Sequence, residues 1–92
     1  MATVFGDKLD EVLVGAANGA MDYIAYVDET WDPKDAEDKV KMLAMEAVHL
    51  ESLGAILRMA QMNECDVVGE LGKIDAEAKE HFRNLQERKP VL

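Results

Sequence analysis

Apolar side chains recur every three or four positions along almost the whole 92-residue chain, and this spacing constrains the fold more than any other feature. Residues three and four apart share one side of an α-helix, so each run predicts an amphipathic helix that needs neighbours for its apolar side. No stretch alternates for long enough to predict a strand. The sequence therefore predicts one all-α domain over residues 1–92, a small antiparallel three-helix bundle that is completed by dimerisation.

The predicted helices cover residues 4–29, 33–63 and 66–88. The main apolar row of the first is Phe5, Leu9, Val12, Ala16, Ala20, Tyr23 and Val27, with Leu13, Ala17 and Ile24 beside it. The main row of the second is Ala36, Val40, Leu43, Ala47, Leu50, Gly54 and Leu57, flanked by Met42, His49, Leu53, Ile56 and Ala60. The row of the third is Val67, Leu71, Ile74, Ala78, Phe82 and Leu85. The broad apolar side of the second helix predicts that it is the central one.

The start of the second helix has the strongest boundary signal. Asp32 is expected to cap it, Pro33 suits its first position, and Asp35 places negative charge in its first turn. Its end is open between two interpretations. Either it ends near Asn63, or it continues to residue 68 and the last helix starts near residue 75.

Two glycines in the first helix call for a reason, because glycine destabilises a helix interior by about 1 kcal/mol relative to alanine. Gly15 and Gly19 lie among alanines, which indicates a close approach by a neighbouring backbone. Chance tolerance of glycine is the alternative.

The net charge of −9 is unevenly distributed along the chain, because residues 1–32 carry seven acidic residues against Lys8 alone. Such a charge repels nucleic-acid phosphates and anionic lipids and attracts basic surfaces. We therefore expect no direct nucleic-acid binding and no membrane binding, and we expect a partner with a basic surface, either a larger protein or a nucleoprotein.

The residues predicted to contact this partner are an acidic group with an aromatic anchor and two methionines. They are Asp22, Asp28, Glu29, Trp31, Asp32, Asp35, Glu37, Asp38, Met45 and Met59. In composition, the chain resembles the small acidic helical inhibitors that phages make against host nucleases and CRISPR complexes, which implies inhibition by nucleic-acid mimicry. A solvated acidic side is the alternative reading.

The methionines and the tryptophan each allow two interpretations. Met45 and Met59 are expected on the outer side of the second helix, where they would mark an interface buried in the dimer, since methionine adapts to irregular contacts. Filling of the core is the alternative interpretation of these methionines. Trp31 either packs across the turn before the second helix or anchors a partner.

Glu46 and His49 form a Glu-x-x-His pair, which places a carboxylate and an imidazole on one side of a helix. The segment from Glu46 to Leu57 resembles a ligand helix of the ferritin-like di-iron proteins, which implies a metal site in a dimeric four-helix arrangement. The first helix offers Ala16, Asn18 and Gly19 where that site needs a carboxylate. The metal protein is therefore the alternative function, and no cofactor is expected in the main one.

We expect no enzymatic activity, because no pair of ionisable residues is spaced to act as nucleophile and base. Cys65 is the single cysteine and is expected to be structural, which favours a reducing, cytoplasmic setting. The longest nearly uncharged stretch, residues 12–21, is too short to span a bilayer.

Overall fold

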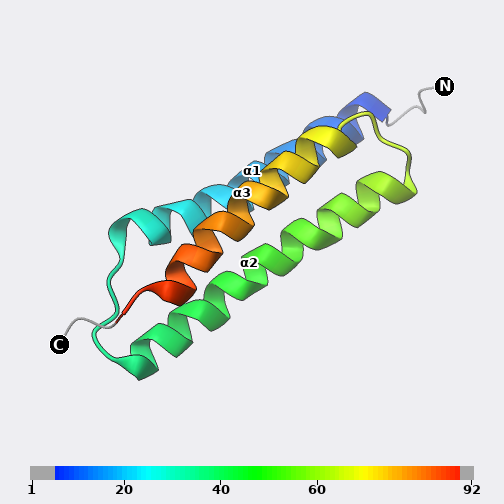
Figure 1. Ribbon diagram of the computed structural model, residues 1–92. Helices are drawn as coiled ribbons and strands as arrows, with labels where there is room; N and C mark the ends of the chain where they lie inside the picture. The colour runs from blue at the N-terminus through cyan, green and yellow to red at the C-terminus, as the bar shows by residue number, and fades with distance from the viewer. Residues whose placement is uncertain (1–5, 90–92) are drawn as a thin grey trace.

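The computed structural model describes residues 6–89 as three helices, α1 (Gly6–Thr30), α2 (Ala36–Met62) and α3 (Val68–Glu87), with no strand in this range. Figure 1 shows α1 and α3 running in the same direction and α2 running opposite to both. The bundle measures 57 × 17 × 15 Å. The predicted antiparallel three-helix bundle is confirmed, and the dimer remains a prediction. Residues 4 and 5 of the first predicted helix lie outside the described range.

Each helix packs against both others. The prediction that α2 is the central helix is therefore wrong, because the three helices have equivalent positions in the bundle. The core is a narrow column in which fully buried alanines allow close helix approach between larger aliphatic side chains. The buried apolar residues are Leu13, Ala17, Ile24, Met42, Leu53, Ala60, Leu71, Ile74, Ala78 and Leu85. None of the three helices is long and apolar enough to cross a membrane.

The predicted core row is right for α3 and only partly right for α1 and α2, whose predicted members Leu9, Ala20, Val27, Leu43, Leu50 and Leu57 do pack against the core. In α1, Val12 is 65% exposed, and in α2, Val40 is 65% exposed, although both belong to predicted main rows. The flanking rows, which contain Leu13 and Leu53, contribute the buried residues. The reason is that α1 and α2 each have apolar residues on two sides, and periodicity does not say which side is buried.

Asp35, not Asp32, caps α2. The Asp35 backbone is extended, and its Oδ1 accepts a hydrogen bond from the Asp38 amide at 2.7 Å. Asp38 Oδ2 in turn accepts from the Lys34 amide at 3.0 Å. Pro33 is fully buried in the connection before the helix, where its rigid ring packs instead of starting the first turn.

The end of α2 agrees with the first of the two interpretations, with Asn63 as its C-cap. Glu64 follows at φ 52°, the left-handed conformation that commonly ends helices. The Glu64 amide donates to Gln61 O at 3.2 Å, and the Cys65 amide donates to Ala60 O at 2.9 Å. These two bonds form a Schellman motif, which reverses the chain towards α3.

The expected close approach at Gly15 and Gly19 does not occur within the chain. A Cβ at either position would have no heavy atom within 4 Å, and both residues are exposed. Within one chain, the glycines therefore have no packing reason.

The Asp35 cap generates a stability prediction. Asp35→Ala should lower the free energy of unfolding by about 1 kcal/mol, because the Asp38 amide loses its acceptor. Asp32→Ala is the matched control and should change it by less than about 0.5 kcal/mol, because Asp32 is exposed and makes no cap. Urea unfolding of both variants is the measurement, and the reverse order would contradict this assignment.

Candidate functional site

The predicted acidic residues at the junction of α1 and α2 share that end of the bundle with several cations. Glu37 Oε1 lies 3.2 Å from Lys41 Nζ, and both side chains are exposed. A shallow pocket there is lined by Lys34, Asp35, Glu37, Asp38 and Lys41. The junction is thus a mixed-charge surface, because cations close in space offset its carboxylates.

Asp28 is buried within the bundle, whereas its predicted role requires an exposed side chain. Its side chain is 8% exposed and faces α3, where three groups surround it. Oδ2 lies 2.8 Å from His81 Nδ1 and accepts from Asn84 Nδ2 at 3.3 Å. Oδ1 accepts from Arg88 Nη2 at 2.9 Å. The Asp28 cluster, meaning these four side chains, therefore ties the end of α1 to the end of α3.

Two opposing effects set the pKa of Asp28. Burial raises it, but the hydrogen bonds from His81 and Asn84 and the positive charge of Arg88 outweigh burial. The pKa of Asp28 therefore lies below its ordinary value of 3.8. The carboxylate is a structural ion-pair partner rather than a reactive acid.

Trp31 is partly buried and packs against the core. Its carbonyl accepts a hydrogen bond from Arg88 Nη1 at 2.6 Å, so one guanidinium binds both Asp28 and the connection after α1. This geometry agrees with the packing interpretation of Trp31 rather than with a free anchor.

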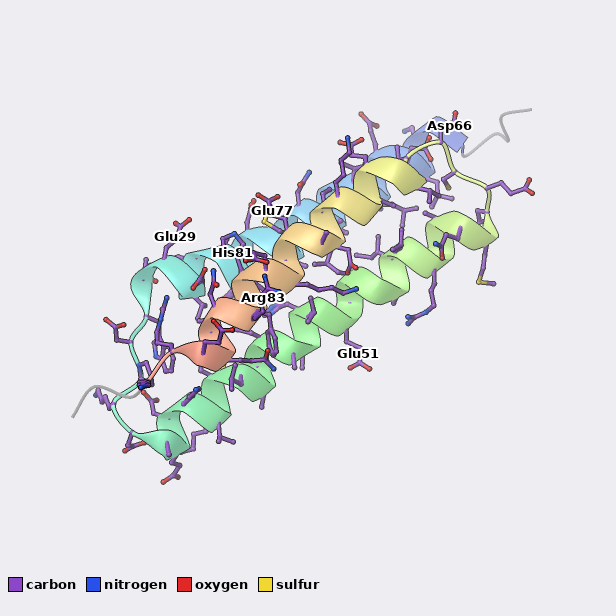
Figure 2. The ribbon with its side chains drawn as sticks, viewed as in Figure 1. Glu29, Glu51, Asp66, Glu77, His81 and Arg83 are labelled. Atoms are coloured by element: carbon purple, nitrogen blue, oxygen red, sulfur yellow. The ribbon has the colours of Figure 1, made fainter. Side chains whose placement is uncertain are left out.

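Exposed carboxylates gather along the groove between α1 and α3. On α1, Glu11, Asp22 and Glu29 are separated by eleven and seven residues, which keeps them on one side of the helix. Glu11 also lines an open groove with Val67, which places this side next to α3. Figure 2 shows Glu29, Glu77 and Asp66 along one long edge of the bundle.

The α3 side of this groove has the same spacing. Steps of four and three residues connect Asp66, Glu70, Lys73, Glu77 and Glu80, all exposed, and continue to Asn84, which contacts Asp28 on α1. We call the seven acidic residues of the two stripes the carboxylate face. They are Glu11, Asp22, Glu29, Asp66, Glu70, Glu77 and Glu80. Glu80 pairs with Arg83 within the chain.

Glu46 and His49 lie together, as the motif predicts, with Glu46 inside the bundle and His49 partly exposed beside it. Glu46 is 2% exposed, its Oε1 lies 3.4 Å from His49 Nδ1, and neither of these buried atoms has a hydrogen-bond partner. The His49 ring stacks on Tyr23 of α1 with the ring centroids 4.6 Å apart. Burial raises the pKa of Glu46 above its ordinary 4.5, and His49 opposes that rise only in part.

A metal at Glu46 and His49 would have two protein ligands. Among the side chains that the structure describes, no group of three or more histidine, cysteine or acidic residues is arranged to hold a metal ion. A ferritin-like di-iron site needs several more carboxylates, so the geometry does not reproduce the ligand set that the motif resembles.

Comparisons of the chain with known protein families, with curated proteins and with solved structures give no match. The functional argument therefore rests on the surfaces described above. Of the predicted partner-binding residues, Asp22 and Glu29 belong to the carboxylate face, and Met45 and Met59 are exposed on α2. Sequence reasoning missed the acidic residues of α3, because their position beside the carboxylates of α1 follows only once α1 and α3 are known to be neighbours.

The Asp28 cluster predicts acid-sensitive stability. Asp28→Asn should lower the free energy of unfolding by about 2 kcal/mol at pH 7, because Arg88 loses its carboxylate partner. The folded-state pKa is lowered, so this stabilisation is complete above pH 3.8 and declines as the pH falls through the folded-state value. Urea unfolding between pH 7 and pH 3 measures it, with exposed Asp22→Asn as control. Equal effects of the two variants would contradict the cluster's role.

The buried Glu46 carboxylate predicts that stability changes with pH in the opposite direction. Its folded-state pKa is raised, so the charged carboxylate destabilises the fold at pH 7 and stability increases as the pH falls towards 4.5. Glu46→Gln should therefore raise the free energy of unfolding at pH 7 by about 1 kcal/mol and lose this gain near pH 4.5. Exposed Glu51→Gln is the matched control, measured by thermal and urea unfolding. A destabilised Glu46→Gln at pH 7 would show that the charge is needed.

Proposed function

We propose that the protein is a small acidic binding protein that docks its carboxylate face onto a basic surface of a larger protein or nucleoprotein and so inhibits or regulates it. The observation that carries this proposal is the pair of stripes with seven exposed carboxylates along the α1–α3 groove, where Lys73 lies within the α3 stripe and Arg83 pairs with Glu80. Parallel rows of like charge on neighbouring helices repel one another, and a cationic surface relieves that repulsion.

This proposal moves the docking surface predicted from the sequence. Asp28 is withdrawn because it is buried, and Asp35 because its carboxylate caps α2. Asp22 and Glu29 remain at the centre and at one end of the surface. The exposed Asp32 and Glu37 lie outside the carboxylate face, at the adjoining end of the bundle, where lysines offset the acidic charge.

A binding role is favoured over catalysis and over metal binding. Asp28 and Glu46, whose pKa values burial and neighbouring side chains shift, both lie in the interior, where a substrate would not reach them. Burial raises the pKa of the Cys65 thiol, as do the carboxylates of Asp10 and Asp66, so this thiol stays protonated and is a poor nucleophile. A metal site at Glu46 and His49 would have only two protein ligands, whereas seven residues form the proposed docking surface. The cytoplasmic setting remains a prediction.

The test compares two variants of equal net charge. Asp22→Asn/Glu70→Gln/Glu77→Gln neutralises three of the seven residues of the carboxylate face, and Asp32→Asn/Glu37→Gln/Glu51→Gln neutralises three exposed residues elsewhere. After a partner is captured from the source cell, its association rate is measured against ionic strength by stopped flow. We expect the face variant to associate about tenfold more slowly at low salt and the control to stay near wild type, with the difference fading towards 1 M salt.

Two outcomes would contradict the proposal. If both variants slow association equally, net charge and not the carboxylate face steers the encounter. If neither variant nor salt changes the rate, the face is a solvated surface.

A further inference from the structure

All of the large hydrophobic side chains that are exposed in the described chain belong to α1 and α2. They are Val12, Tyr23, Tyr26, Val40, Met45, Val48, Met59 and Met62. None belongs to α3, although it packs against the same two helices. The exposed apolar surface is therefore confined to one region and is not a general property of this thin bundle.

Six of these eight residues continue a regular pattern on each helix. On α1 the pattern is Val12, Ala16, Gly19, Tyr23 and Tyr26, and on α2 it is Met45, Val48, Ser52, Ala55 and Met59. We call these ten exposed residues the outer seam. Their steps alternate between four and three residues, which is the spacing by which helices pack against further helices in coiled coils and four-helix bundles.

The two halves of the outer seam lie side by side. Tyr23 of α1 stacks on His49 of α2, and Met45 and Ser52 lie on the same side of α2 as His49 because they are four and three residues away. Because α1 and α2 are antiparallel, a step of eleven residues from Tyr23 towards the start of α1 covers the same length as a step of eleven residues from His49 towards the end of α2. Val12 therefore lies near the level of Met59, and Ala16 and Gly19 near the levels of Ala55 and Ser52.

The charge of the outer seam restricts what it fits. None of its ten residues is ionisable as an acid or a base at neutral pH, in a chain of net charge −9. A basic partner finds no carboxylate on it, and an anionic membrane finds no lysine or arginine. Two copies of the chain repel each other overall, and this is the surface on which they meet with the least repulsion.

The area of the outer seam suits a dimer. Six large side chains at about 60% exposure present roughly 600 Å², and the small residues between them add more. A stable interface takes about 800 Å² from each partner, and monomers rarely leave apolar patches beyond 300–600 Å² uncovered. Ser52 does not oppose burial, because its hydroxyl already donates to Val48 O at 2.9 Å.

We propose that a second copy of this chain covers the outer seam, about a two-fold axis parallel to the helices. This axis places α1 of one copy antiparallel to α2 of the other, so that four helices alternate in direction around a second core. Tyr23 then faces Val48 of the partner subunit, and Tyr26 faces Met45 of the partner subunit. Both α3 helices stay outside.

This arrangement gives Gly19 the close neighbour that the single chain does not supply. Gly19 and Ser52 are small and lie at the middle of the seam, between the large residues at its two ends. Two copies can therefore approach closely there, as helices with small residues at their crossing do.

The first test is the mass in solution, with paired variants on one helix. Sedimentation equilibrium at micromolar concentration should give twice the 10.2 kDa of the chain. Val48→Lys should weaken the dimer by at least about tenfold, because it buries a charge in the seam. Val40→Lys is the matched control, since Val40 is equally exposed on α2 but outside the seam, and it should leave the dimer intact. Circular dichroism should show the same helix content for all three proteins.

A second pair guards against effects on folding. Gly19→Gln finds open space within its own chain, so the monomer should keep its fold while the dimer weakens at least about tenfold. Gly72→Gln on α3, where the space is also open, should not weaken it. A monomer at 100 µM, or a dimer that Val48→Lys and Gly19→Gln leave unchanged, would overturn the proposal. So would a dimer broken by Val40→Lys and not by Val48→Lys.

Discussion

A bundle of three long helices can bury only one side of each, and the other properties of this protein depend on that limit. Its core is a column with alanines such as Ala17, Ala60 and Ala78 at points of close approach, within a bundle only 17 Å wide. Only a small part of the circumference of each helix contacts this column, so most of the surface of each helix stays exposed to solvent. Helix α3 has one apolar side, and the bundle buries it. Helices α1 and α2 each have a second apolar side that the bundle cannot bury, and these two exposed sides form the outer seam.

The same limit explains which parts of the fold the sequence predicted. Three helices, their approximate bounds and the core row of α3 followed from spacing and from the capping residues around Pro33, because these are local signals. The core rows of α1 and α2 followed only in part, because two apolar sides satisfy the same periodicity. Asp28 and Glu46 occupy core positions in the flanking rows, as their steps from Ile24 and Met42 show, but a carboxylate there contradicts the usual pattern of apolar residues inside.

The candidate site was predictable only in kind. The number of charged residues along the chain predicted an acidic binding surface, and their positions in the sequence placed this surface at the junction after α1. Folding returns Arg88 to this junction from the other end of the sequence, and it aligns Glu70 and Glu77 of α3 with Asp22 of α1. Charge patterns along a sequence do not contain these long-range neighbours, so the arrangement of the charges over the folded surface did not follow from them.

Helix α1 contributes to both proposed surfaces, with the outer seam towards α2 and the carboxylates towards α3. The outermost line of α1, between Tyr26 and Glu29, is shared by their borders. A partner confined to the α1–α3 groove leaves a second copy in place, and the dimer then offers two carboxylate faces to a nucleoprotein with repeated basic surfaces, which strengthens binding by avidity. A partner broad enough to pass over α1 competes with the second copy. Self-association then opposes binding, and the two equilibria are linked through one helix.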